Sequence, residues 1–319
     1  MCEQMGGWAK FAEVLALAVR AIAHDNRIFA SRKTKGHFMQ HVRLLKLAVA
    51  AFIAGVGALT AGSAAAEDVN MWDGQWHFEV SPYAWVPWMY TTVQLPPIAG
   101  GGNPTEEVQP SQYLKYVKAG ALFDASVRKG DWGLWTDLVY LNLQNSASHE
   151  RQINLPGLLP GAPATLPIIR TTESGIRAAI WTLAPTYTVM NNDVGTLDVM
   201  VGLRYTSLSI SFAYNFTAPP LPLQRGGGFW PSSDSTDGLI GIKGSLRLSS
   251  DGKWFLPYEA DVGDGSKNWQ YNAVVGAGYH FHWGDVTLAA RNLTYQISDK
   301  PVLEKVRMTG PVLGFTFRW

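Results

Sequence analysis

Hydrophobic and polar positions alternate with a period of two over most of the chain beyond residue 66. One face of the segment 268–283 carries Trp269, Tyr271, Ala273, Val275, Ala277, Tyr279, Phe281 and Trp283. Successive side chains of a strand point to opposite faces, so this spacing predicts a β-strand with aromatic residues near its ends. The same reading gives ten strands, at 75–93, 113–128, 132–145, 170–190, 195–213, 237–249, 253–263, 268–283, 285–297 and 305–319.

The links between these segments are short and long by turns. RKGDW, NNDVG, SSDGK and HWGD are short turns, whereas the links centred on Gly101, Pro160 and Gly227 are long. Outer-membrane barrels have an even number of antiparallel strands, short periplasmic turns and longer extracellular loops. We therefore predict an all-β fold, a closed antiparallel transmembrane β-barrel of ten strands, or of eight if 237–249 and 253–263 merge with their neighbours. The turn at Asn191-Asn192 is expected to be periplasmic and the three long loops extracellular.

The final segment carries an apolar face up to its last residue. Leu313, Phe315, Phe317 and Trp319 share one parity, opposite small or polar residues. An apolar strand with a free edge invites pairing with other chains, and backbone groups in lipid must be paired within the protein. We therefore expect the last strand to close against the first.

One segment breaks the alternation. In 285–297, Val286 and Leu288 set one parity, whereas Leu293 and Tyr295 set the other. A single extra residue in one strand would shift the parity in this way, so we predict a β-bulge near Arg291.

The composition favours a protein with an apolar outside. Aromatic residues make up 12% of the chain, but charged residues only 16%, which is low for a soluble surface. A soluble β-sandwich would also alternate, with its aromatic face as a core. Residues 1–66 hold 8 Lys and Arg against 3 Asp and Glu, which leaves 18 against 22, or −4, for the remainder, so a nucleic-acid partner is not expected. Cys2 is the single cysteine, which excludes an intramolecular disulfide.

A secretory signal is predicted at 39–66. His41, Arg43 and Lys46 precede an apolar run from Leu47 to Leu59, and Ala64-x-Ala66 provides small residues for cleavage before Glu67. The alternative is a transmembrane helix, since the apolar stretch is long enough to span. Residues 1–38 are interpreted as an upstream mis-start or extension. The barrel then occupies 67–319.

Several stretches resemble a known family. FEVSPYAWVP, VRKGDWGLWTDLVYLNL, VGLRYTSL, YEADVG, WQYNAVVGAGYHF and MTGPVLGFTFRW are similar to a proteobacterial family of outer-membrane β-barrel proteins, the OmpA/OmpW-like and porin-type sequences. The resemblance covers nearly all of 75–319 outside the loops. It implies a bacterial outer-membrane location, contact with outer-membrane lipid and lipopolysaccharide, and a C-terminal signal for the barrel-assembly machinery made by Phe315, Phe317 and Trp319.

Strand parity places charged side chains inside the predicted barrel. The inward set is Glu79, Asp124, Asp137, Asp198, Glu259 and Asp261 with Lys118, Arg128, Arg204, Lys243, Arg247 and Arg318. Six acids face six bases. An unpaired ion out of bulk water costs several kcal/mol, and a barrel of this size is only slightly wider than one that side chains fill, so we predict a lumen plugged by ion pairs.

Other chemistry is weakly signalled. His280-x-His282, with His77 or Glu79 across the lumen, has a spacing that can hold zinc or copper, but rim histidines are ordinary and no metal or cofactor is predicted. His149-Glu150 lacks a nucleophile motif, and the strand ends lack the acidic and histidine set of omptin-type surface proteases. The prediction is a non-enzymatic, porin-like barrel that passes at most small solutes. A non-conducting structural or surface-interaction barrel is the alternative, and an outer-membrane hydrolase a remote one.

Overall fold

The computed structural model describes residues 71–93, 105–154, 165–217, 219, 224–230, 232–265, 268–297 and 303–319. The predicted signal segment, the residues before it, and the loop centres Gly101 and Pro160 lie outside these ranges. A search of the described residues for a helix with the length and apolarity to cross a membrane finds none.

The described chain is almost entirely strand. The elements are β1 (Trp76–Trp85), β2 (Trp88–Val93), β3 (Thr105–Val108), α3 (Pro110–Tyr113), η3 (Leu114–Tyr116), β4 (Val117–Lys129), β5 (Trp132–Asn154), β6 (Thr165–Asn192), β7 (Gly195–Thr217), β8 (Gln224–Phe229), β9 (Ser232–Arg247), β10 (Trp254–Asp264), β11 (Asn268–Phe281), β12 (Gly284–Ile297) and β13 (Leu303–Arg318).

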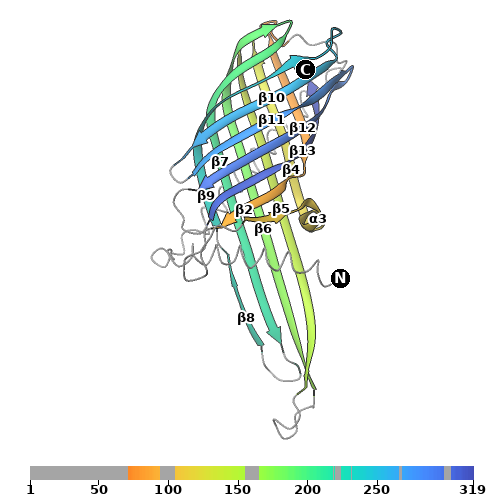
Figure 1. Cartoon of the computed structure of the whole chain (residues 1–319), viewed down its shortest axis with the longest axis vertical. Helices are drawn as coiled ribbons and strands as arrows, with labels where there is room; N and C mark the ends of the chain where they lie inside the picture. The colour runs from red at the N-terminus through yellow and green to blue at the C-terminus, as the bar shows by residue number, and fades with distance from the viewer. Residues whose placement is uncertain are drawn as a thin grey trace.

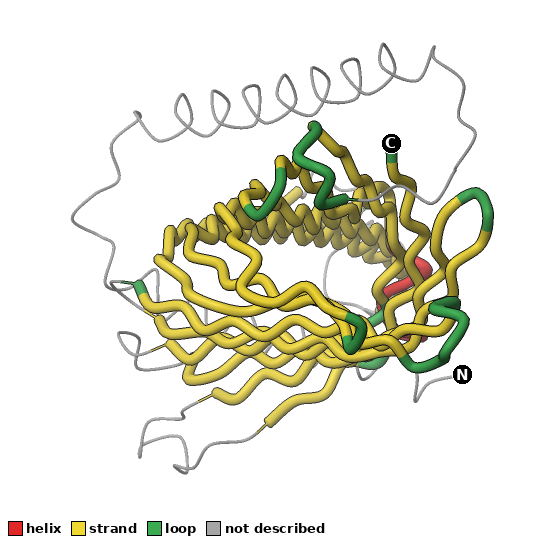
Figure 2. The backbone as a smooth tube through the Cα atoms, turned by 90° about the horizontal axis from the view of Figure 1, so that it is seen from above, coloured by secondary structure: helices red, strands yellow, loops and turns green. Residues whose placement is uncertain are grey.

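The strands form one closed antiparallel barrel (Figures 1 and 2). The order runs β1-β4-β5-β6-β7-β9-β10-β11-β12-β13, and β13 pairs with β1. β2 continues the line of β1 along the barrel wall and also pairs with β13. β1 and β2 are interrupted near Pro87, which has no N–H to donate. Closure extends to the last residue, because Phe78 and Trp319 exchange backbone hydrogen bonds of 2.8 and 3.1 Å. The ten-stranded barrel and the closure of the last strand on the first are confirmed.

The outer wall carries an apolar belt. Val201, Val262, Val275 and Leu288 expose 52 to 63% of their surface outward, on four different strands. Aromatic rings gather beside the short turns: Phe281 and Trp283 stack at 5.6 Å between centroids, and Trp283 lies 5.8 Å from Phe317. An apolar band ending in aromatic side chains is what a lipid-facing barrel surface requires. The fold is a transmembrane β-barrel.

The short turns follow from local chemistry. Gly130 and Gly252 have φ of 58° and 70°, a left-handed conformation that glycine adopts without strain. At the turn between β6 and β7, the Asn192 side-chain oxygen accepts hydrogen bonds from the backbone N–H of Val194 and of Gly195. Such asparagine turns join neighbouring antiparallel strands within a few residues.

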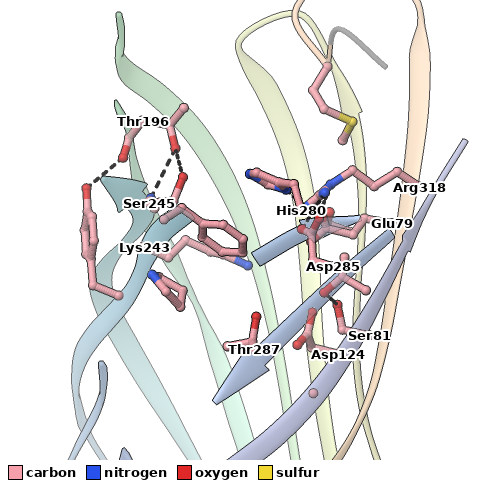
Figure 3. A pocket seen from close by; sticks show the side chains of 18 of the residues that line it. Glu79, Ser81, Asp124, Thr196, Lys243, Ser245, His280, Asp285, Thr287 and Arg318 are labelled. Carbon is pink, nitrogen blue, oxygen red and sulfur yellow. Dashed lines mark hydrogen bonds and ion pairs between the residues drawn. The ribbon is translucent and has the colours of Figure 1, made fainter. Parts of the chain in front are cut away.

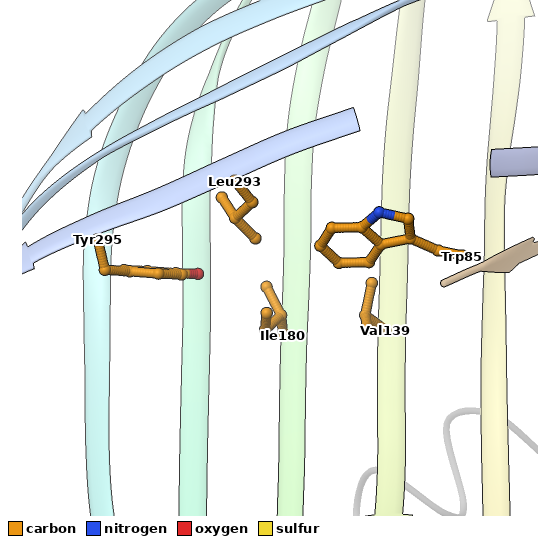
Figure 4. Packing of buried hydrophobic residues seen from close by; sticks show 5 residues of the cluster. All are labelled: Trp85, Val139, Ile180, Leu293 and Tyr295. Carbon is orange, nitrogen blue, oxygen red and sulfur yellow. The ribbon is translucent and has the colours of Figure 1, made fainter. Parts of the chain in front are cut away.

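The bulge predicted near Arg291 is wrong. β12 pairs in unbroken register with both β11 and β13, so residues 285 to 295 of odd number all point inward. Leu293 and Tyr295 therefore lie inside the barrel, where they pack with other apolar side chains (Figure 4). Part of the lumen is packed like a core, so apolar residues occur on the inward face and the parity of hydrophobicity reverses without an extra residue.

The loop predicted around Gly227 is also wrong, because this residue lies in β8, which pairs with β7. β5 and β7 have 23 residues each and β6 has 28, so they extend well beyond the neighbouring strands (Figure 1). Much of the second predicted loop, including the backbone of Arg151, is strand. The extensions of β5 and β6 lack a continuous apolar face, since they stand outside the belt, and the hydropathy pattern therefore did not mark their full length.

Between β3 and β4 the chain packs onto the inner wall. Tyr113 and Val108 form an apolar cluster with Leu143, and the Tyr113 hydroxyl donates a 2.9 Å hydrogen bond to the carbonyl of Pro87. β4 begins with an irregularity in its pairing with β5, between Val117 and Ala119. The predicted strand start at 113 is therefore replaced by α3 and η3.

Candidate functional site

The middle of the lumen is crossed by hydrogen-bonded ion pairs. Arg204 on β7 donates from Nη1 to Asp261 Oδ1 at 2.8 Å and from Nη2 to Asp261 Oδ2 at 3.0 Å. Its Nε donates to the Thr182 hydroxyl at 2.8 Å. The Arg204 and Asp261 side chains are fully buried, and the two-pronged geometry matches guanidinium to carboxylate. The pair thus joins β7 to β10.

A second arginine lies on the opposite side. Arg291 on β12 donates from Nη2 to Asp137 Oδ2 at 2.7 Å and from Nη1 to the Tyr83 hydroxyl at 2.9 Å. Tyr83 in turn donates to Asp137 Oδ1 at 2.6 Å. The Arg291 guanidinium also lies 5.0 Å from the ring centroid of Trp85, a cation–π contact. This cluster joins β12 to β1 and β5.

Asn272 connects the two clusters. Its Oδ1 accepts from Arg291 Nε at 3.0 Å, and its Nδ2 donates to Asp261 Oδ2 at 2.9 Å and to Glu259 Oε1 at 2.5 Å. We call the connected group the septum: Thr182, Arg204, Asp261, Gln270, Asn272, Arg291, Tyr83 and Asp137. Thr182, Arg204 and Gln270 are 0% exposed, and side chains that line a water-filled path could not be.

An apolar layer adjoins the septum on the side of the strand extensions. Trp85, Val139 and Ile180 are at most 8% exposed and pack with Leu293 and Tyr295 across the lumen (Figure 4). The Tyr295 hydroxyl lies 3.0 Å from the Thr206 hydroxyl. Water would find few polar partners in such a layer, namely this hydroxyl pair and the buried indole N–H of Trp85.

On the side of the short turns and of the C-terminal residue, the lumen opens into a cavity of about 1230 Å³, the vestibule (Figure 3). Lys243, Asp124 and Glu259 line it beside the septum. The Lys243 ammonium lies 4.5 Å from the ring centroid of Trp135. The vestibule therefore ends at the septum in a surface that carries charges of both signs and the ring of Trp135.

Ion pairs also occur near the mouth of the vestibule. Arg128 pairs with Asp198, and Arg318 pairs with Glu79 at 2.7 Å and with Asp285 at 2.5 Å. These bridges connect β4 to β7 and β13 to β1 and β12.

At the mouth itself, His77 Nε2 at the start of β1 lies 2.6 Å from Oδ1 of Asp73, which precedes the strand. The hydrogen bond with His77, followed by one from the backbone N–H of Gln75, lowers the pKa of the exposed Asp73 carboxyl.

The structure brings most of the predicted inward charges together. Asp137, Asp198, Glu79, Arg128, Arg204, Asp261 and Arg318 are ion-paired in the lumen, Glu259 accepts from Asn272, and Asp124 and Lys243 line the vestibule. Arg247 lies at the mouth, 3.5 Å from Asp193, with 52% of its side chain exposed. Lys118 is exposed at the irregular start of β4 and lies outside the septum.

Sequence reasoning missed Arg291, which holds one half of the septum. The predicted bulge hid its orientation. Strict alternation along the strand would have placed Asp285 and Arg291 on the same inward face. It also missed Asp237, which is 0% exposed and accepts hydrogen bonds from Ser235 and Asn268.

The histidines considered for metal binding have other surroundings. His280 Nδ1 lies 2.5 Å from Asp285 Oδ1, and the His280 ring stacks on Phe255 at 4.3 Å between centroids. Within the described ranges, no three His, Cys, Asp or Glu residues are grouped as a metal ion would require. Phe315 and Phe317 lie exposed on the outer wall beside Trp319, and their assembly role stays a prediction.

Comparisons with known proteins find barrels at low similarity. No protein-family model matches the chain, and no curated protein does. Among solved structures, the outer membrane protease OmpT from Escherichia coli is 11% identical, with 80% of this chain and 100% of that chain covered and a TM-score of 0.40. The attachment invasion locus protein Ail of Yersinia pestis is 10% identical over 76% and 98%, at 0.28. The translocator domain of the autotransporter NalP from Neisseria meningitidis is 15% identical over 85% and 98%, at 0.34. Likeness at this level identifies no family, so the resemblance to OmpA/OmpW-like proteins stays a prediction.

Proposed function

We propose that this protein is a bacterial outer-membrane barrel with a closed lumen, which acts through the sheet that β5 to β8 raise beyond the belt. The observation that carries the proposal is the septum. Seven strands contribute side chains to it, through Tyr83, Asp137, Thr182, Arg204, Asp261, Asn272 with Gln270, and Arg291. Opening a path would require the ion pairs to part in a poorly hydrated interior, where each uncompensated charge costs several kcal/mol.

The outer-membrane location is part of the proposal. Its support is the apolar belt with aromatic ends, together with the predicted signal segment at 39–66. Closed barrels with lipid-facing walls occur in the outer membranes of bacteria and related organelles. With the short turns and the C-terminal residue on the periplasmic side, the extensions of β5 to β8 stand on the cell surface.

A narrow porin-like path is the second candidate, and the vestibule favours it. A cavity of about 1230 Å³ occupies the periplasmic half of the lumen and contacts the septum. Lys243, which lines this cavity, is in a cation–π contact with Trp135, a weaker interaction than a buried ion pair. In that case passage would be limited to small solutes.

Conductance of the refolded full chain in planar bilayers tests the proposal. The wild type should show no steady openings, whereas Arg291→Ala should admit water where the guanidinium bridged Asp137 and Tyr83, and produce brief leaks. Arg247→Ala, which removes an exposed arginine at the mouth, is the matched control and should stay closed. Large, steady wild-type channels would refute the closed lumen, and small ones would favour the second candidate.

A further inference from the structure

The projecting sheet has two different faces. β5, β6, β7 and β8 pair in continuous register here, so residues opposite one another lie on the same face. The face that continues the inner wall of the barrel carries Phe212, Tyr214 and Phe216 along β7. The other carries Glu150 and Glu173 among mostly small or uncharged polar residues. Aromatic side chains and carboxylates are thus segregated onto opposite faces.

Positive charge gathers on the aromatic face in a single row across the sheet. The register sets His149 opposite Arg170, Arg170 opposite Phe216, and Phe216 opposite Arg225. We call these four residues the basic rung. Neighbouring strands are about 4.8 Å apart, so the rung spans about 14 Å. His149, Arg170, Phe216 and Arg225 are all exposed.

The rung lacks a counter-charge of its own. Among the described residues of this face on β5 to β8, none is a carboxylate, and the Arg170 guanidinium is held by the ring of Phe216, 5.7 Å from its centroid. Arg170 and Arg225 stand on either side of Phe216, so two guanidinium groups share this row. Guanidinium groups bind sulfate, phosphate and carboxylate through paired hydrogen bonds. The row therefore suits an external polyanion.

The row of aromatic residues along β7, Phe212, Tyr214 and Phe216, limits the class of ligand that this face suits. The ring of Tyr214 lies 6.3 Å from that of Phe212 and 5.6 Å from that of Phe216. Gly227 lies opposite Tyr214, and a Cβ there would come within 2.7 Å of the Tyr214 hydroxyl, so the glycine leaves room for this ring. Successive flat rings beside a row of cations suit a chain of apolar-faced rings that bear anionic groups. Acidic polysaccharides have this chemistry, and flexible acidic peptides do not.

We propose that the aromatic face of the projecting sheet, with the basic rung, binds an acidic polysaccharide bearing sulfate or carboxylate groups. Sugar rings pack on Tyr214 and Phe216, and Arg170 and Arg225 hold anionic groups on either side of Phe216. This inference rests on the proposed function, which places the sheet on the cell surface.

Binding of labelled dextran sulfate to the refolded full chain in lipid vesicles tests the inference. Dextran sulfate should bind with an affinity that falls as salt rises, and neutral dextran should not. Arg170→Gln and Arg225→Gln should each weaken binding about tenfold or more, and Phe216→Ala about three- to tenfold. Arg247→Gln removes an exposed arginine at the opposite end of the barrel and should change nothing. Circular dichroism verifies that every variant keeps its β-structure.

Three results would overturn the inference: no binding of dextran sulfate by the folded protein, equal loss in Arg247→Gln, or equal binding of poly-glutamate with no effect of Phe216→Ala. The last result would mean that charge alone is recognised and an acidic peptide serves equally. Conductance of the same preparations separates the two proposals. A closed barrel that does not bind refutes only the polysaccharide site, and a conducting barrel that binds refutes only the closed lumen.

Discussion

Replacing Arg204 with alanine should destabilise the barrel more than almost any other single truncation. The guanidinium makes two hydrogen bonds to Asp261, one to Thr182 and a longer one to Gln270, and neither charged side chain is exposed. Removing it leaves the Asp261 carboxylate in the lumen with Asn272 as its remaining direct donor among the described side chains. Breaking one partner of a buried pair costs about 3–5 kcal/mol, and the cavity left by a long side chain adds to this.

Urea unfolding of the refolded protein in detergent, followed by tryptophan fluorescence, measures this loss. The double variant Arg204→Leu, Asp261→Leu removes both charges and keeps apolar volume, so it should recover most of the lost free energy of unfolding. The control Arg247→Ala removes an arginine whose ion pair is exposed, and should cost less than about 1 kcal/mol. If Arg204→Ala unfolds at the wild-type urea concentration, or if the double variant is no more stable than the single one, the septum is not held by this charge pair.

Three further predictions concern the apolar layer, the orientation and the mouth. Leu293→Ala should lower the free energy of unfolding by about 2–5 kcal/mol in the same urea assay, because it opens a cavity in a packed lumen; an unchanged midpoint would contradict that packing. On intact cells, a membrane-impermeant maleimide should label Gln224→Cys on β8 and spare Asp193→Cys in the turn after β6, and the reverse pattern would invert the orientation. The lowered pKa of Asp73 means that its contact with His77 is present above the ordinary pKa of an aspartate and is lost as pH falls through the lowered value. An NMR titration should therefore place the Asp73 midpoint below that of the His77→Ala variant, and equal midpoints would refute this contact.

The amino-acid sequence by itself determined the wall of this protein. Alternation such as that of Val275 and Ala277 against Gly276 and Gly278 fixes which side chains meet lipid, because the lipid face must be apolar at every second position. Short turns with glycine or asparagine join neighbouring strands, and an apolar last strand requires a partner for its edge. Strand number, closure and outer face could therefore be predicted.

The interior could be predicted only in part. Parity placed Arg204 and Asp261 in the lumen, but it could not pair them. They are 57 residues apart in the sequence, and their contact depends on how the ten strands curve around the barrel axis. The pattern also failed to place Leu293 inside the barrel. A lumen filled by side chains is polar in one layer and apolar in the next, so an inward residue need not be polar. Whether an inward residue is polar or apolar depends on the side chains across the barrel, and a local sequence pattern does not contain that information.

Beyond the belt, only the tertiary structure decided the outcome. The far ends of β5 and β6 and the short β8 hold residues that a hydropathy pattern assigns to loops, since neither face needs to be apolar outside the membrane. They are strands because each pairs with a neighbour already in register from the barrel. The same register sets Arg170, Phe216 and Arg225 side by side, although they stand in three separate strands, and so the surface with the clearest chemistry was the one that the sequence did not reveal.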